Sequence, residues 1–491
     1  MTSPPDNTPV LVGIGIATQR EDDWSKGKEP LALMLDAVRA AGADSGAPDL
    51  LTALDWIGVP HGRWDYRNPG GAIARAVGAN RAISVFASVG VLQQTLIGLA
   101  CAGISRGESQ AALVVGGDCG YRALRAAIAG ATLADSQQDD APDKHLKPKD
   151  HLFHAVERAR GLAMPVGLYA IIESALRRQQ GQSLASHRAQ LGALYENFSE
   201  VAAKNPHAWD RARRSADDIA SAGSRNPMQA FPYTRALCSA LNVDQAGALL
   251  FCSVAKARAL GIPPERWVFP LASTESNHQV PVSARAELTR CPGARLAGEA
   301  ALAAAGLRVS EIDLLDLYSC FPAAVQVYAN ELGIPTERAL TFTGGMSFAG
   351  GPWNNYVLQT TCRAVELLRA GQGRNAFISS VSGMLTKQGF GLYALTPPSA
   401  GFIHEEVSET TAAAQQTVEV EAQYSGPGFV AGYTVIHQRG RAPRYLALVD
   451  TPDGRRALVA GEDVEFCASM EAEEWVGRTV AVQVDRLVSR P

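Results

Sequence analysis

A segment that occurs twice constrains the fold of this chain more than any other feature of its sequence. The first copy covers residues 83–118 and the second covers residues 342–383. Each copy has a Gly/Ser-rich turn, a largely apolar helical stretch, a glycine that ends the helix, and an apolar strand. A duplicated turn–helix–strand unit indicates two related halves that pack as stacked α/β layers.

The two glycines that end the helices, Gly107 and Gly371, set the register of the copies. Counting back the same distance from each places Gly90 and Asn354 at equivalent helix starts. A helix N-terminus presents unpaired N–H groups and the positive end of the helix dipole, so it suits a thiolate or an oxyanion. The first start nevertheless has a glycine, and the loop before it has no cysteine. The sequence therefore predicts the scaffold of a reactive site without its expected nucleophile.

Length and composition exclude several classes of function. A chain of 491 residues with 46% hydrophobic residues is long enough for more than one domain. The net charge of −4 gives no indication of a nucleic-acid or polybasic membrane surface. The eight cysteines occur singly, without metal-binding spacing, and the first residues lack the basic segment of a signal peptide. We therefore expect a cytoplasmic protein with reduced thiols and no metal.

One apolar stretch resembles a membrane span. Residues 83–105 contain no charged side chain and are numerous enough to cross a bilayer. They include Gln93, Gln94 and several glycines and serines, and a helix buried between two sheets is also apolar all round. We expect a buried helix and no membrane span.

The remaining patterns predict the domain organisation. Residues 1–270 form the first half, with an excursion of charged helices and polar loops near residues 120–240, and residues 271–398 form the second half. From residue 399 the pattern changes to alternating apolar and polar residues separated by turns. This change predicts a separate domain, residues 399–491, that is a small antiparallel β-barrel, of which an OB-like barrel is one form.

Several longer motifs carry a family resemblance. They are HAVERARGLAMPVGLYAIIESALR, NVDQAGALLFCSVAKARALG, DLYSCFPAAVQVYANELG, LTFTGGMSFAGGPWNNYV and LTKQGFGLYA. Together they resemble the thiolase superfamily, and most closely the thiolase-like proteins type 1, which are related to sterol-carrier-protein thiolases. The likeness covers residues 8–396, and the trailing domain matches that group too. It implies a five-layered αβαβα fold, a coenzyme A thioester as substrate or ligand, and, as in thiolases, a homodimer.

The resemblance maps the reactive positions of thiolases onto this chain. Their nucleophilic cysteine falls at Gly90, with Ser88 close by, although a serine would need a general base to become nucleophilic. Their Gly-His-Pro histidine falls at Gly351, and their second cysteine, which moves the substrate α-proton, falls at Ser380. None of the three reactive side chains is present, so we do not expect conventional thiolysis.

Tyr318 is the polar group that the resemblance singles out. It begins the motif at residues 318–321, and relatives that perform retro-aldol cleavage of CoA thioesters also have tyrosine there. We expect its hydroxyl to point toward the helix starts at Gly90 and Asn354, whose N–H groups would lower its pKa while burial would raise it. The alternative is a pocket-wall tyrosine that hydrogen-bonds to backbone.

Other candidate residues have weaker support. Lys387 is a candidate for a CoA phosphate and His278 for the pocket lining. Cys101, Cys119 and Cys320 are interpreted as structural thiols, because a reactive thiol needs an electropositive, partly open site.

Two classes of function stay open. The first is an enzyme that acts on acyl-CoA thioesters by chemistry other than thiolysis, as a lyase or an acyltransferase. The second is a non-catalytic protein that binds an acyl-CoA or a partner chain. The two differ in whether Gly90, Tyr318, Gly351 and Ser380 converge on one open, ligand-sized pocket.

Overall fold

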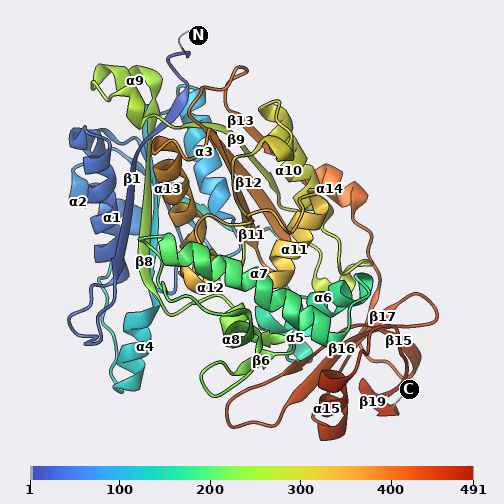
Figure 1. Ribbon diagram of the computed structural model, residues 1–491. Coiled ribbons are helices and arrows are strands. Elements are labelled where there is room, and N and C mark those ends of the chain that lie inside the picture. The colour runs from blue at the N-terminus through green and yellow to red at the C-terminus, as the bar shows by residue number, and fades with distance from the viewer. Residues whose placement is uncertain (1–3, 150, 490–491) are drawn as a thin grey trace.

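Two β-sheets with helices between and outside them form the larger part of the structure (Figure 1). The computed structural model describes residues 4–149 and 151–489. In order across the first sheet, the strands are β1 (Pro9–Gln19), β8 (Asp244–Ser253), β4 (Ala111–Cys119), β2 (Trp56–Pro60), β3 (Ile83–Ala87) and β5 (Lys144–Leu146). In order across the second sheet, they are β10 (Leu314–Asp316), β11 (Asn375–Ser382), β12 (Lys387–Ala394), β9 (Phe269–Ser276) and β13 (Ile403–Glu406).

The helices complete the layers around these sheets (Figure 1). Helices α3 (Gln93–Ser105) and α13 (Tyr356–Arg369) lie between the two sheets. The outer face of the first sheet is covered by α1 (Pro30–Asp44) and α2 (Pro69–Val77), and that of the second by α10 (Pro292–Ala304) and α11 (Pro322–Glu331). The predicted five-layered α/β arrangement of two related halves is confirmed.

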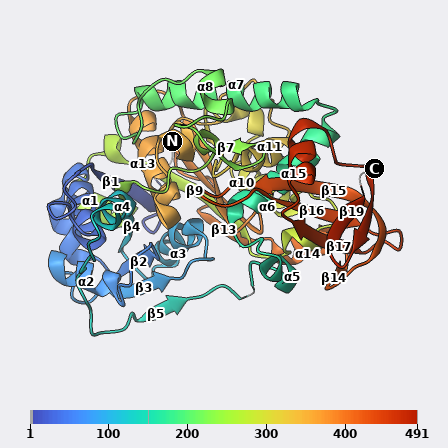
Figure 2. The same cartoon turned by 90° about the horizontal axis from the view of Figure 1, so that it is seen from below.

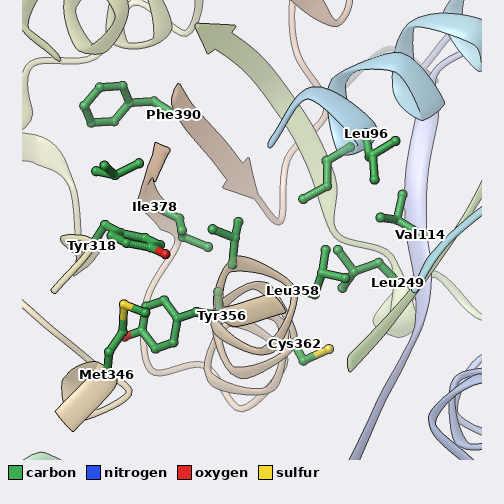
Figure 3. Packing of buried hydrophobic residues seen from close by; sticks show 14 of the residues in the cluster. Leu96, Val114, Leu249, Tyr318, Met346, Tyr356, Leu358, Cys362, Ile378 and Phe390 are labelled. Atoms are coloured by element: carbon green, nitrogen blue, oxygen red, sulfur yellow. The ribbon is translucent and has the colours of Figure 1, made fainter. Parts of the chain in front are cut away.

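The central position of α3 and α13 explains why both are apolar around most of their circumference. Leu96 of α3 and Leu358 of α13 are fully buried in one continuous core (Figure 3). Helix α3 has 13 residues, fewer than the roughly 20 that a spanning helix needs. Within residues 4–149 and 151–489, no helix is long and apolar enough to cross a membrane. The apolar stretch at residues 83–105 is therefore a strand, a loop and a buried helix.

The ends of the two central helices differ in how well the sequence predicts them. Gly107 and Gly371 adopt positive φ values of 74° and 69° just after the helices, as helix-ending glycines do. The starts predicted at Gly90 and Asn354 are wrong, because α3 begins at Gln93 and α13 begins at Tyr356. Gly90, with φ of 102°, and Asn354, with φ of −92° and ψ of 42°, are non-helical residues of the preceding loops.

The excursion after β4 runs over the layered core toward the C-terminal region (Figure 1). Its helices are α4 (Gly120–Ile128), α5 (Ala155–Ala159), α6 (Pro165–Gln179), α7 (Leu184–Lys204) and α8 (Ala216–Ala220), and its short strands are β6 (Met228–Ala230) and β7 (Tyr233–Thr234). Strand β6 pairs with β15 of the C-terminal sheet through Ala230 and Ile436. The excursion and the C-terminal strands thus share one sheet.

The C-terminal region is rich in strands, as the period-two pattern predicts. In order across the third sheet, they are β14 (Val420–Glu421), β17 (Arg456–Gly461), β16 (Arg444–Asp450), β15 (Gly426–Ile436), β18 (Thr479–Gln483) and β19 (Arg486–Ser489). The described pairings leave β14 and β19 at the two ends, so closure into a barrel is not confirmed. Two helices, α14 (Ser408–Ala414) and α15 (Val464–Ala472), accompany the strands and were not expected from the alternating pattern.

A buried arginine joins the excursion to the C-terminal sheet. Arg177 of α6 is fully buried, and its guanidinium donates to Glu474 at 2.7 and 3.0 Å and to the Tyr433 hydroxyl at 2.8 Å. It also lies over the Tyr433 ring, 5.3 Å from the centroid. A buried charge is tolerated only with a partner, so the pair fixes how these two regions meet.

We expect Glu474→Ala to lower the free energy of unfolding by about 2–4 kcal/mol, because it leaves the buried Arg177 charge without its carboxylate. The adjacent Glu473 offers a matched control, since its partner Arg478 is partly exposed and their distance is 2.9 Å. Glu473→Ala should cost about 1 kcal/mol or less. Urea unfolding followed by tryptophan fluorescence measures both, and equal midpoints for the two variants would contradict the role given to Arg177.

Candidate functional site

Tyr318 and Ser380 lie side by side at the ends of two neighbouring strands. Tyr318 follows β10, and its backbone N–H donates to the Ser379 hydroxyl of β11 at 2.7 Å. Ser380 is the next residue of β11, and its carbonyl accepts from the Tyr328 hydroxyl at 3.0 Å. The Ser380 hydroxyl is buried without a hydrogen-bond partner among the described residues. It therefore has no base that would make it a proton shuttle.

Gly351 belongs to the same neighbourhood through Met346. Met346 lies in the short helix α12 (Gly345–Phe348), and its N–H donates to the Ser319 hydroxyl, next to Tyr318, at 3.0 Å. A Cβ atom on Gly351 would lie 3.3 Å from Cε of Met346 and 3.2 Å from Cβ of Ser239. These contacts fill the space beside Gly351, so a histidine there would need its neighbours to move.

Gly90 is held from the second sheet. Its carbonyl accepts from Nζ of Lys387, a buried residue of β12, at 2.8 Å. A Cβ atom on Gly90 would lie 3.0 Å from Cγ of Pro148, and the positive φ disfavours any other residue. Lys387 thus fixes the loop before α3, and its burial argues against the predicted contact with a CoA phosphate. His278 is half-buried in the loop after β9.

Two hollows of the structure lie away from these four positions. One hollow has a volume of about 10 Å³ and is lined by Thr343 and Tyr356, among others. The other has a volume of about 290 Å³ and lies between α6, Leu288 and Arg456 of the C-terminal sheet. Neither is lined by Gly90, Tyr318, Gly351 or Ser380.

Tyr318 is packed among side chains of the core (Figure 3). Its ring meets the Tyr356 ring edge to face, with centroids 5.7 Å apart, and both are buried. Burial raises the pKa of Tyr318 far above its usual range, and the nearby Cys320 thiol acts in the same direction. The predicted lowering of this pKa by the helix starts is therefore not the dominant effect.

The start of α13 is closed by a side chain from α3. Oε1 of Gln93 accepts from the Val357 N–H at 2.7 Å, and Nε2 of Gln93 donates to Oδ1 of Asn354 at 3.1 Å. Gln93 is the first residue of α3 and is buried. One of the N–H groups that the sequence assigns to a ligand is therefore occupied within the protein.

A buried carboxylate, which sequence reasoning missed, holds the Gly-rich loop of the second copy. Oδ2 of Asp316 lies 2.7 Å from Oγ1 of Thr341 and accepts from the Thr343 N–H at 3.1 Å. Oδ1 of Asp316 lies 3.0 Å from the Tyr356 hydroxyl. Burial raises the pKa of Asp316. The sequence signal that could have revealed this residue is an aspartate within the largely apolar run IDLLDL.

The cysteines behave as structural thiols. All eight are free, and burial raises the pKa of Cys101 and of Cys119, while that of Cys320 rises to about 12. A thiolate is disfavoured at each of these positions. In the described part of the chain, no group of His, Cys, Asp and Glu side chains could hold a metal ion.

One further pair lies beside Gly90. Oγ of Ser88 is 2.8 Å from Nε2 of His145, a residue of β5. The two residues are 57 positions apart, so no local pattern could have connected them.

Comparisons with known proteins agree with this architecture. Residues 408–486 match the thiolase-like protein type 1 additional C-terminal domain. A monomeric SCP2-thiolase-like protein type 1 from Mycobacterium smegmatis superposes with a TM-score of 0.84 and 26% identity, over 99% of this chain and 100% of that chain. The chain has a thiolase-like fold and an additional C-terminal domain.

Two more distant structures show the same fold. An Ltp2–ChsH2(DUF35) aldolase has a TM-score of 0.60 and 19% identity, covering 79% of this thiolase-like chain and 98% of its own. An acetyl-CoA acetyltransferase from Syntrophomonas wolfei has a TM-score of 0.56 and 18% identity, covering 80% and 100%. A search of curated proteins gave no match.

We expect Gln93→Leu to lower the free energy of unfolding by about 1–3 kcal/mol, because it leaves the buried Val357 N–H without an acceptor. Gln372→Leu is the control, since Gln372 is exposed after α13. Thermal unfolding followed by circular dichroism compares the two. A Gln93→Leu protein as stable as the control would show that this link between the central helices does not contribute to stability.

Proposed function

We propose that this thiolase-like protein binds acyl-CoA thioesters and does not catalyse their thiolysis. The observation that carries the proposal is the fold, which extends over the whole of a thiolase-like relative while the three reactive positions hold Gly90, Gly351 and Ser380. Support for the ligand comes from the fold shared with an acetyl-CoA acetyltransferase. The eight free cysteines support a cytoplasmic location.

Thiolysis needs groups that this chain lacks. The position that corresponds to the nucleophilic cysteine of thiolases is Gly90, which has no side chain that could be acylated. The α-proton of the substrate requires a base, and the Ser380 hydroxyl has no partner that would activate it. General acid or base groups contribute roughly 10²–10⁴-fold each, and a set that acts together is lost together.

The oligomeric state forms part of the proposal. The M. smegmatis relative is described as monomeric. In this chain β13 covers β9, so the second sheet ends on a strand of four residues. Very short edge strands offer little backbone for pairing with another chain. We therefore favour a monomer over the homodimer that the thiolase resemblance implied.

A retro-aldol lyase is the second candidate. The contact between Tyr318 and Tyr356 favours it, because it brings two phenol groups together near the Gly-rich loop. Burial raises the pKa of both hydroxyls, which disfavours a phenolate that would act as base. Because a buried phenol is costly to ionise, we favour a binding function over a lyase activity.

The purified protein should bind acetyl-CoA saturably in isothermal titration calorimetry and should show no thiolysis of acetoacetyl-CoA above the uncatalysed rate, because the nucleophile and both proton carriers are missing. Free CoA with the same buffer is the ligand control. Thiolysis at rates typical of enzymes, roughly 1 per second or more, would contradict the proposal.

Tyr318→Phe separates the two candidates. A binding protein should retain the acetyl-CoA affinity of the wild type, because the ring and its packing are unchanged and only a buried hydroxyl is lost. If the protein only binds its ligand, neither the wild type nor Tyr318→Phe should cleave a 3-hydroxyacyl-CoA to a carbonyl compound and a shorter acyl-CoA. Cleavage by the wild type that Tyr318→Phe abolishes would establish the lyase instead.

A further inference from the structure

Ser88 and His145 form a hydrogen-bonded pair that neighbouring strands hold in place. Ser88 follows β3, and His145 is the middle residue of β5, which pairs with β3 in parallel. The Ser88 N–H donates to the Leu146 carbonyl at 2.9 Å, which fixes the two chains beside the pair. The 2.8 Å distance between Oγ and Nε2 is that of a nucleophile and its base.

The pair lies where α/β sheets commonly bind ligands. Strands β2, β3 and β5 are parallel, and Ser88 comes directly after the carboxyl end of β3. Ligands of open α/β sheets bind outside the carboxyl ends of the strands. Strand β5 is the outermost strand of its sheet (Figure 2). His145 is exposed and Ser88 is half-buried. A substrate can reach the pair from solvent without entering the Tyr318 cluster.

The surroundings of His145 favour its neutral, basic form. Neighbouring groups remove part of the water around the exposed His145 ring, which lowers its pKa, and the charges of Lys147 and His61 act in the same direction. The Phe86 ring lies 5.1 Å from the rings of both His145 and His61, which restrains the imidazole. A neutral imidazole can accept the serine proton through Nε2 when its other nitrogen carries the hydrogen.

The turn after Ser88 offers donors for an oxyanion. The Val91 N–H turns back to the Ser88 carbonyl at 3.1 Å, and Gly90 adopts its positive φ within this turn. Among the described residues, the N–H groups of Val89 and Gly90 donate to no protein acceptor. Backbone donors next to a nucleophile can stabilise the charge that develops on a carbonyl oxygen.

Charge around the pair selects the acyl donor. Lys144, Lys147 and Lys149 are exposed and flank His145 along the chain. The carboxylates that precede them, Asp140 and Asp143, are bonded to Arg75 and Ser84. A group of positive charges at an open site raises the local concentration of anionic substrates. A thioester that carries phosphate groups is thus favoured over a neutral ester.

We propose that Ser88 is an acyl-accepting nucleophile, with His145 as its base, that hydrolyses acyl thioesters of phosphate-bearing thiols. The choice of acyl donor rests on the proposed function, whereas the nucleophile does not. Oγ of Ser88 bonds to the thioester carbonyl carbon as its proton passes to Nε2 of His145. The C–S bond then breaks, and the thiolate takes that proton and leaves as a thiol.

Water completes the reaction. It attacks the acyl-Ser88 ester while His145 takes one of its protons, and that proton returns to Oγ as the carboxylic acid departs. No carboxylate hydrogen-bonds His145 among the described contacts, and loss of such a partner costs about 10⁴-fold in a full triad. Turnover is therefore slow, and covalent labelling is the more sensitive readout.

The test is labelling with a fluorophosphonate probe, read by intact mass and peptide mapping. The wild type should gain one label at Ser88, and Ser88→Ala should gain none. His145→Gln should label about 10²-fold more slowly, the contribution of a general base. Two controls should label like the wild type. Ser25→Ala removes an exposed serine whose partner is Asp23, and His437→Gln removes a histidine bonded to Glu471.

No label on folded wild type, a label at another residue, or equal rates for His145→Gln and the wild type would overturn the proposal. Titration of Ser88→Ala with acetyl-CoA separates it from the proposed function. If Ser88→Ala still binds acetyl-CoA but is no longer labelled, the result supports both the proposed function and the role of Ser88. Labelling of Ser88 in a wild type that binds no acetyl-CoA would leave this inference standing and remove the proposed function.

Discussion

The hydrogen bonds of Gln93 are the interaction on which the rest of the site depends. They connect the start of α3 to the start of α13 at the centre of the five layers, where both helices lie between the two sheets. An amide side chain can both donate and accept, so Gln93 bonds Oδ1 of Asn354 and the Val357 N–H together. The point where the two copies of the repeat meet is thereby closed by the protein itself.

The surroundings of this link are arranged for packing. Lys387 holds the loop at Gly90 from one side, and Asp316 with its threonine partners holds the Gly-rich loop of the second copy from the other. Tyr318, Met346 and Tyr356 fill the space between (Figure 3). The hydrogen bonds of these buried groups favour this arrangement of the loops over its alternatives. The thiolase-like fold is present, and Lys387 and Asp316 hold two of its loops in place.

The sequence predicted the architecture because that information is local. The duplication, the glycines Gly107 and Gly371 and the switch to period two each depend on neighbouring residues, and the layers and C-terminal strands follow from them. The helix starts were misplaced because Gly90 and Asn354 belong to loops whose backbone only tertiary contacts set. The pKa of Tyr318 depends on its burial, and the Ser88–His145 contact depends on the pairing of β3 with β5. The local sequence pattern predicts neither of them.

We infer that the meeting point of α3 and α13 is closed and that thioester chemistry takes place elsewhere. A crystal structure with acetyl-CoA bound would show where the thioester lies. We expect Gln93 still to accept from the Val357 N–H and the thioester to lie outside the cluster of Tyr318, Met346 and Tyr356. A thioester carbonyl that accepts from the Val357 N–H, with Gln93 displaced, would show that the meeting point is open to the ligand.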